Sequence, residues 1–193
     1  MRVISGIYRG RPLKAPKGSG TRPTTDRVKE TLMSSLISAY GSFEGAHVLD
    51  AFAGSGALGI ECLSRGAANA QFFERDRAAL EALKSNIAAL RIPSERARVF
   101  KADVMKNPPV FGAVPFDIVF LDPPYAYEAA DVLALVRSLA DAGRLSANAV
   151  VSYEHDASTA IMPYLGKNAL DMQILSSKRF GGTVIDLFGF ESN

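Results

Sequence analysis

The sequence predicts an α/β fold with a mostly parallel, seven-stranded sheet. Short apolar runs alternate with stretches of helical spacing as far as residue 154, a pattern typical of parallel strands joined by helical crossovers. Two further apolar runs, joined by Gly181-Gly182, predict a terminal antiparallel hairpin and therefore a reversed edge strand. With 193 residues and 48% hydrophobic content, the chain is expected to form one domain with a sizeable core.

The individual elements follow from local periodicity. A helix over 25–40 carries Val28, Leu32 and Leu36 on one face, and the polar residues at its start can cap it. The other helices are predicted over 60–65, 77–90 and 128–141, and the strands over 48–53, 70–74, 98–103, 116–121, 149–154, 170–180 and 183–190.

The N-terminal segment is strongly basic. Residues 1–30 hold eight Lys or Arg against two acids, a net charge of +6, so the rest of the chain carries −4 of the overall +2. This polarity favours a polyanionic partner, with a solvated tail as the alternative. Val3-Ile4 and Ile7-Tyr8 predict a small β-hairpin within a basic arm over 1–20, ahead of a domain over 21–193. Arginines beside an aromatic residue suit looped RNA.

The strand over 116–121 runs into Asp122-Pro123-Pro124-Tyr125. Two prolines fix φ near −65° and remove two N–H groups, so the turn presents the Asp122 carboxylate and backbone carbonyls as acceptors. Two acceptors can hold both protons of an exocyclic amine on a base and direct its lone pair toward an electrophile. Tyr125 offers a stacking face. We interpret these four residues as a candidate catalytic turn; a turn that merely ends the strand is the alternative.

Acidic residues also end the other predicted strands. Asp50 precedes the glycine run 54–59, which permits a tight turn and matches the spacing of a dinucleotide fingerprint. A carboxylate here suits a cationic amino-acid group better than a pyrophosphate. Glu74 suits a ribose diol, and Asp103 suits an adenine amine. Because ligands of open α/β sheets bind at the carboxyl ends of strands, these acids together predict an S-adenosylmethionine site beside the amine-binding turn.

Longer segments carry a resemblance to a known family. Through 50–56 and 122–125 the chain resembles class I methyltransferases that modify exocyclic amines. Through RVISG (2–6), YRGR (8–11), TRPTTDRVKETL (21–32), LDAFAGSGALG (49–59) and LSRGA (63–67) it resembles the bacterial ribosomal RNA small subunit methyltransferase D family, the 16S rRNA guanine-N2 methyltransferases. The resemblance implies a Rossmann-like class I fold, S-adenosylmethionine as methyl donor, and 16S rRNA as partner within an assembled small subunit or an assembly intermediate.

The same resemblance implies roles for individual residues. Cofactor contacts are expected from Asp50, Phe52, Gly54, Ser55, Gly56, Glu74, Asp103 and Thr25, and RNA contacts from Arg2, Tyr8, Arg9, Arg11 and Arg22. In the family the segment around 22–26 lies over the cleft, although simple helix capping also explains its residue types. The implied reaction is direct transfer of the sulfonium methyl to an amine nitrogen. The turn itself does not distinguish guanine N2 from adenine N6 or cytosine N4.

Other classes fit parts of the pattern. A DNA amino-methyltransferase shares both motifs but usually needs a separate target-recognition region. A protein-glutamine methyltransferase usually has Asn in place of Asp122. A catalytically silent RNA-binding assembly protein would keep the fold, although the intact turn argues against silence. A nicotinamide dehydrogenase would share the glycine spacing, but the catalytic Tyr-x-x-x-Lys arrangement of such enzymes does not accompany these glycines.

Several absences narrow the expectation further. Cys62 is alone and cannot form an intrachain disulfide, and the two histidines, His47 and His155, are far apart and expected to be structural or exposed. No cluster has metal-ligand spacing, so no metal is expected. The chain opens without an apolar leader and has no apolar run of the ~20 residues that a membrane span needs. A cytoplasmic monomer is therefore expected.

Overall fold

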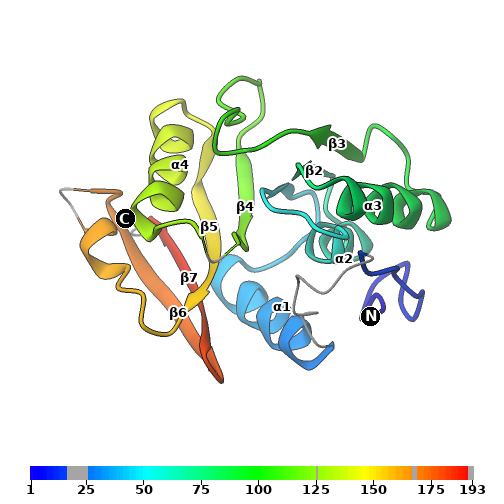
Figure 1. Cartoon of the computed structure of the whole chain (residues 1–193), viewed down its shortest axis with the longest axis horizontal. Coiled ribbons are helices and arrows are strands. Elements are labelled where there is room, and N and C mark those ends of the chain that lie inside the picture. Colours follow the sequence, from blue (N-terminus) through cyan, green and yellow to red (C-terminus); the bar gives the residue numbers. More distant parts are fainter. Residues whose placement is uncertain (17–25, 125, 167–168, 191–193) are drawn as a thin grey trace.

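The computed structural model describes residues 1–16, 26–124, 126–166 and 169–190 (Figure 1). These residues form one seven-stranded sheet in the order β3-β2-β1-β4-β5-β7-β6. The strands are β1 (His47–Asp50), β2 (Asn69–Glu74), β3 (Ala97–Lys101), β4 (Phe116–Leu121), β5 (Leu145–Asp156), β6 (Met172–Phe180) and β7 (Thr183–Phe190). The helices are α1 (Asp26–Tyr40), α2 (Ala57–Ser64), α3 (Arg77–Ala89) and α4 (Ala129–Asp141), with a short 3₁₀ turn, η1 (Met162–Tyr164).

The topology confirms a mostly parallel sheet with one reversed strand. Strands β1 to β5 are mutually parallel, and β7 runs antiparallel to both β5 and β6. The reversed strand lies one place inside the edge, because the tight connection at Gly181-Gly182 pairs β6 with β7 while β7 pairs with β5. Strand order reverses direction between β1 and β4. In open α/β sheets, such a switch point is where ligands bind.

Some element boundaries differ from the sequence prediction. The strand expected over 48–53 ends at Asp50, because the chain then turns and the N–H groups of Ala51 and Ala53 bond the carbonyls of Phe120 (3.1 Å) and Phe73 (2.9 Å) on the two neighbouring strands. Helix α2 begins at Ala57, three residues before the predicted start. Strand β5 extends beyond the predicted 149–154 at both ends.

Alternation along the strands divides the core into two layers. Val48, Phe120 and Val150 belong to a buried cluster with side chains of α1, α2 and α3. Their neighbours Leu49, Val119 and Val151 belong to the cluster on the opposite face, which α4 covers. Since side chains alternate between the faces of a strand, every second residue of β1, β4 and β5 points toward α1 and α2.

Residues 1–16 pack on the helical layer as a wide loop. The two ends of this loop pair through an antiparallel bridge between Arg2 and Pro12, and the Val3 N–H donates a hydrogen bond to the Arg11 carbonyl at 3.0 Å. The predicted pairing of Val3-Ile4 with Ile7-Tyr8 is therefore wrong. The physical reason is that α2 takes these backbone donors: Ile4 and Ser5 donate to Glu61 (2.8 and 3.0 Å), and Ile7 and Tyr8 donate to Ser64 (2.8 and 2.9 Å).

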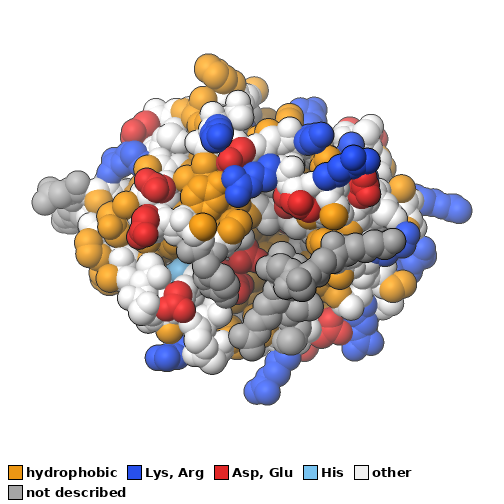
Figure 2. Space-filling view, viewed as in Figure 1, with side chains coloured by type: hydrophobic (Ala, Val, Ile, Leu, Met, Phe, Trp, Pro, Cys, Tyr) orange, Lys and Arg blue, Asp and Glu red, His pale blue; other side chains and the backbone are white. Residues whose placement is uncertain are grey.

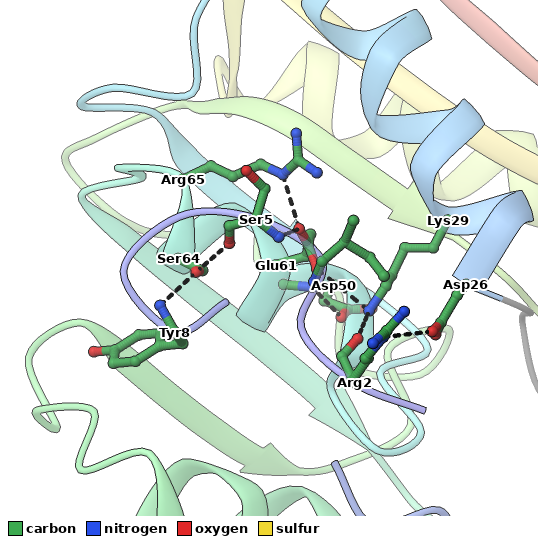
Figure 3. A network of polar contacts seen from close by, with 11 residues as sticks. Arg2, Ser5, Tyr8, Asp26, Lys29, Asp50, Glu61, Ser64 and Arg65 are labelled. Carbon is green, nitrogen blue, oxygen red and sulfur yellow. Dashed lines mark hydrogen bonds and ion pairs between the residues drawn. The ribbon is translucent and has the colours of Figure 1, made fainter. Parts of the chain in front are cut away.

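Glu61 connects three segments that lie far apart in the sequence (Figure 3). It lies on the otherwise apolar helix α2 and is fully buried beside Lys29 of α1, at 3.3 Å between Oε2 and Nζ. Arg65 Nε donates to its other oxygen at 2.9 Å. Burial lowers the pKa of Lys29, while the Glu61 carboxylate opposes that shift. Four donors thus satisfy one buried carboxylate, and the N-terminal loop, α1 and α2 are fixed together.

Candidate active site

Asp50 lies at the deepest point of the candidate site, where β1 meets the glycine loop. The residue is 3% exposed, and its Oδ2 accepts from Gly59 N–H at 3.0 Å. Burial raises the pKa of Asp50 to about 7; the Gly59 hydrogen bond opposes this shift and the Glu74 carboxylate adds to it. A buried carboxylate with a raised pKa favours a positively charged neighbour.

The glycine loop needs its glycines at defined points. Gly56 has φ 79° immediately before α2, and a Cβ there would lie 2.3 Å from the side chain of Leu83. A Cβ on Gly59 would lie 2.3 Å from the ring of Phe72. In contrast, a Cβ on Gly54 would meet no atom of the described residues within 4 Å. The loop is therefore packed tightly against α3 and β2 at Gly56 and Gly59.

Glu74 holds the tip of the glycine loop. Its Oε2 accepts from Gly54 N–H at 2.8 Å and its Oε1 accepts from Asp76 N–H at 2.6 Å. The nearby Ser55 is buried, and its carbonyl accepts from Asn86, which also bonds Lys14. The N-terminal loop is thus tied through one asparagine to the candidate cofactor loop.

An aromatic and cationic group lies beside Asp103. Arg75 Nη1 bonds Asp103 Oδ2 at 2.9 Å and the hydroxyl of Tyr127 at 2.8 Å, with its guanidinium 5.6 Å from the Tyr127 ring. Phe52 packs against Tyr127 at 6.0 Å between ring centroids. Arg75 is not among the site residues predicted from the sequence. The available signal was a basic residue directly after the strand-ending Glu74.

The switch point brings the candidate catalytic turn next to Asp50. Asp50 pairs in register with Phe120 of β4, so Asp122 lies on the same face two residues further toward the carboxyl edge. Leu121 pairs with Tyr153 of β5, which places Glu154 beside Asp122 at the same level. Asp50 likewise pairs with Phe72 of β2, two residues before Glu74.

We call the resulting line of acids the carboxylate row. Following the strand order β2-β1-β4-β5, it consists of Glu74, Asp50, Asp122 and Glu154. With neighbouring strands about 4.8 Å apart, the row spans about 14 Å. Figure 2 shows acidic side chains near the middle of this view, with basic side chains both among them and along much of the rim. The carboxylate row lies at the carboxyl ends of four neighbouring strands.

The pKa of Asp122 reflects this arrangement. Desolvation, followed by the charges of Glu154 and Asp50, raises it to about 7. The residue itself is exposed at the surface. Pro123 is half-buried and Pro124 is exposed, and the Pro124 carbonyl accepts from Tyr127 N–H at 3.1 Å. Tyr125 lies outside the described residues, as do Thr25 and Arg22.

Of the residues predicted to bind RNA, Arg2, Tyr8, Arg9 and Arg11 lie in the N-terminal loop that packs over α1, α2 and α3. Arg2 forms an ion pair with Asp26 at 2.9 Å. Arg9 and Arg11 are exposed, and Arg11 also donates to the Ala89 carbonyl at 3.2 Å. Tyr8 is half-buried and packs on the core cluster of the helical layer. Its ring is therefore less available for stacking than the sequence suggested.

Two further features concern metals and membranes. Within the described ranges, no group of three or more His, Cys, Asp or Glu is placed to hold a metal ion. His155 instead bonds Asp186 at 2.9 Å, and His47 bonds Asn69 at 2.6 Å. No helix in the part of the chain that the structure describes has the length and apolar character needed to cross a membrane.

The switch point, the glycine loop and the acidic strand ends define the fold of a class I methyltransferase. A solved structure described as "Putative methyltransferase yhhF from Escherichia coli" superposes with a TM-score of 0.82 at 35% identity, covering 100% of this chain and 99% of that one. The family model described as "Conserved hypothetical protein 95" matches residues 1–189.

Curated relatives give that family its particular name. "Ribosomal RNA small subunit methyltransferase D" of Haemophilus influenzae is 40% identical over 157 residues, which is 80% of this chain and 78% of that protein. The protein of the same name from Escherichia coli K12 is 46% identical over 125 residues, 65% of this chain and 60% of that protein. The chain belongs to the ribosomal RNA small subunit methyltransferase D family.

Proposed function

We propose that this protein transfers the methyl group of S-adenosylmethionine to the exocyclic N2 amine of a guanine in 16S rRNA, with an assembled small subunit or an assembly intermediate as substrate. One observation carries the proposal: the turn that begins at Asp122, directly after β4, lies beside Asp50 at the switch point of a methyltransferase fold. The names of the relatives supply the rRNA substrate.

The donor set fits this cofactor. The pKa values of Asp50 and Asp122 are both raised, and a cation placed between these two residues would relieve both their burial and their mutual repulsion. Asp50 is proposed to hold the cationic amino-acid end and Glu74 the ribose, while Asp103 and the rings of Phe52 and Tyr127 accommodate the adenine. When bound, S-adenosylmethionine supplies an electrophilic methyl group on a sulfonium.

The chain's own residues then orient the acceptor. The Asp122 carboxylate and the Pro123 carbonyl accept the two amine protons and turn the nitrogen lone pair toward the methyl. Transfer forms a carbon–nitrogen bond, breaks a carbon–sulfur bond and leaves the nitrogen with one proton to lose. A carboxylate whose pKa lies near neutrality is a competent acceptor for that proton. A base inside a helix must swing out to reach this turn.

Methyl transfer to defined substrates tests the proposal. Labelled cofactor is supplied with unmethylated small subunits, bare rRNA or duplex DNA, and the product nucleosides are separated. N2-methylguanosine in ribosomal material is the expected product; label in DNA, or as methyladenosine, would overturn the substrate assignment.

A variant pair tests the role of Asp122. Asp122→Ala is expected to abolish transfer while cofactor affinity, measured by calorimetry, stays nearly unchanged. Asp141→Asn, on the exposed end of α4, should retain both. Parallel loss of cofactor binding in Asp122→Ala would count against an amine-orienting role.

A further inference from the structure

The proposed reaction leaves one question about the base. Guanine, adenine and cytosine all offer an exocyclic amine, and the turn at Asp122 accepts from any of them. The bases differ at the ring nitrogen next to that amine. Guanine N1 carries a hydrogen and is a donor, whereas adenine N1 and cytosine N3 are acceptors. Enzymes that extrude a base read it through hydrogen bonds to this edge. A residue beside the amine-binding turn can therefore select the base.

Glu154 occupies the position beside that turn. Strands β4 and β5 are parallel neighbours, and Leu121 pairs with Tyr153. Both of these side chains belong to the core cluster on the α4 face. The next residue of each strand, Asp122 and Glu154, therefore points to the opposite face at the same level. Neighbouring strands lie about 4.8 Å apart, a spacing that matches two adjacent groups on one base better than two separate ligands.

The strand order places Glu154 on the side of Asp122 where the rest of the base is expected to lie. Asp50 lies on one side of Asp122, toward the glycine loop, and Glu154 lies on the other side. A cofactor held near Asp50 and an amine held at Asp122 leave the remainder of the base nearest β5. The half-buried Glu154 is in electrostatic contact with Asp122.

The neighbouring histidine does not alter the chemistry of this position. His155 is the next residue of β5 and so points to the other face of the sheet. Its two ring nitrogens contact Asp186 Oδ2 and the Asp156 carbonyl, each at 2.9 Å. His155 is thus engaged behind the strand, and Glu154 adds a second carboxylate, a group that accepts hydrogen bonds, beside Asp122.

We infer that Glu154 is a specificity-determining residue that accepts the N1–H of the target guanine while Asp122 holds its N2 amine. This inference rests on the proposed function. Guanine presents donors to both carboxylates. Adenine or cytosine would place a ring-nitrogen lone pair against Glu154, and the carboxylate would lose a hydrogen bond and gain a repulsion.

The test compares two bases that share the 2-amine. The guanine that the wild-type protein methylates is first mapped, and small subunits are then reconstituted with guanine or 2-aminopurine at that position. 2-Aminopurine keeps the 2-amine, but its N1 has no hydrogen. We expect wild-type kcat/KM to favour guanine by about ten- to a hundredfold, the range for one well-formed base contact.

A conservative variant then assigns the discrimination to this residue. Glu154→Gln can turn its amide N–H₂ toward the N1 acceptor, so the preference for guanine should shrink at least about tenfold. Asp156→Asn removes one negative charge from the same strand end, where Asp156 bonds Ser158, and should leave the preference unchanged. Cofactor binding and thermal unfolding of both variants are measured alongside.

Each result is decisive. Equal wild-type activity on the two bases would overturn the inference without any variant, as would a guanine preference that Glu154→Gln leaves intact. If Glu154→Gln does not fold, the wild-type comparison still decides whether N1–H is read at all. Absence of any wild-type transfer to guanine would instead refute the proposed function.

Discussion

Asp50→Asn should stabilise the cofactor-free protein at neutral and alkaline pH. In the folded state the pKa of Asp50 is about 7, against an ordinary value of 3.8. Between these values the folded protein holds a proton that the unfolded chain has released, so the free energy of unfolding falls as pH rises through this window. At about 1.36 kcal/mol per unit, the full loss is about 4 kcal/mol above pH 7.

Asparagine cannot ionise, so the variant should lack this part of the pH dependence. Its amide oxygen can still accept from Gly59 N–H, which keeps the loop contact. We therefore expect Asp50→Asn to approach the wild type in stability near pH 4 and to exceed it by up to about 4 kcal/mol at pH 8. The same substitution should weaken binding of S-adenosylmethionine, because the ionised carboxylate is what a cation stabilises.

Urea unfolding of the cofactor-free protein at pH 5, 6.5 and 8 measures the effect, with Asp141→Asn as a matched loss of one exposed carboxylate. The control should parallel the wild type. The reasoning is refuted if the Asp50→Asn and wild-type stabilities stay parallel across this pH range. A second readout is calorimetric binding of S-adenosylmethionine, which should tighten as pH rises toward 7 in the wild type and change little in the variant.

Three further experiments test other parts of the structure by substitution. Gly6→Ala and Gly10→Ala impose similar backbone strain, at φ 83° and 78°, but only the alanine at position 6 would place its Cβ 1.8 Å from a backbone oxygen of α2. Thermal unfolding should therefore show Gly6→Ala to be markedly the less stable variant. Equal losses of stability would contradict the docked loop. Glu61→Gln leaves a buried ammonium group without its counter-charge and should cost about 3–5 kcal/mol in urea unfolding; a loss under about 1 kcal/mol would show that water reaches the network. Replacing Arg9 and Arg11 by Ala should weaken rRNA binding and flatten its logarithmic salt dependence by up to about 0.7–0.9 per lost phosphate contact, and an unchanged slope would remove both from the interface.

Local periodicity was sufficient for much of the fold. The apolar run 116–121 and the two strands joined at Gly181-Gly182 form as predicted, because side-chain alternation and turn chemistry are local properties. The predicted strand over 48–53 was too long. The chain turns after Asp50, although Ala51 and Ala53 still donate hydrogen bonds to the neighbouring strands.

The candidate site was predictable only in part. The acids at the strand ends were identified from their positions, but their order across the sheet depends on strand pairing, which periodicity does not encode. Glu154 therefore appeared as the end of a strand and not as a neighbour of Asp122. The hairpin error has a related cause: the N-terminal donors bond a helix more than 50 residues away in the sequence, and no local pattern reports that competition.

The position of Glu61 has a consequence for the order in which the chain can fold during synthesis. Ile4 is made 57 residues before the carboxylate that receives its N–H. At about 5–20 residues per second, translation takes about 3 to 11 s to supply that partner. Lys14 waits longer still, since its acceptor Asn86 lies 72 residues later. The most basic stretch of the protein is therefore synthesised well before the residues on which it docks. In that interval Arg11 lacks the Ala89 carbonyl that it bonds in the folded protein.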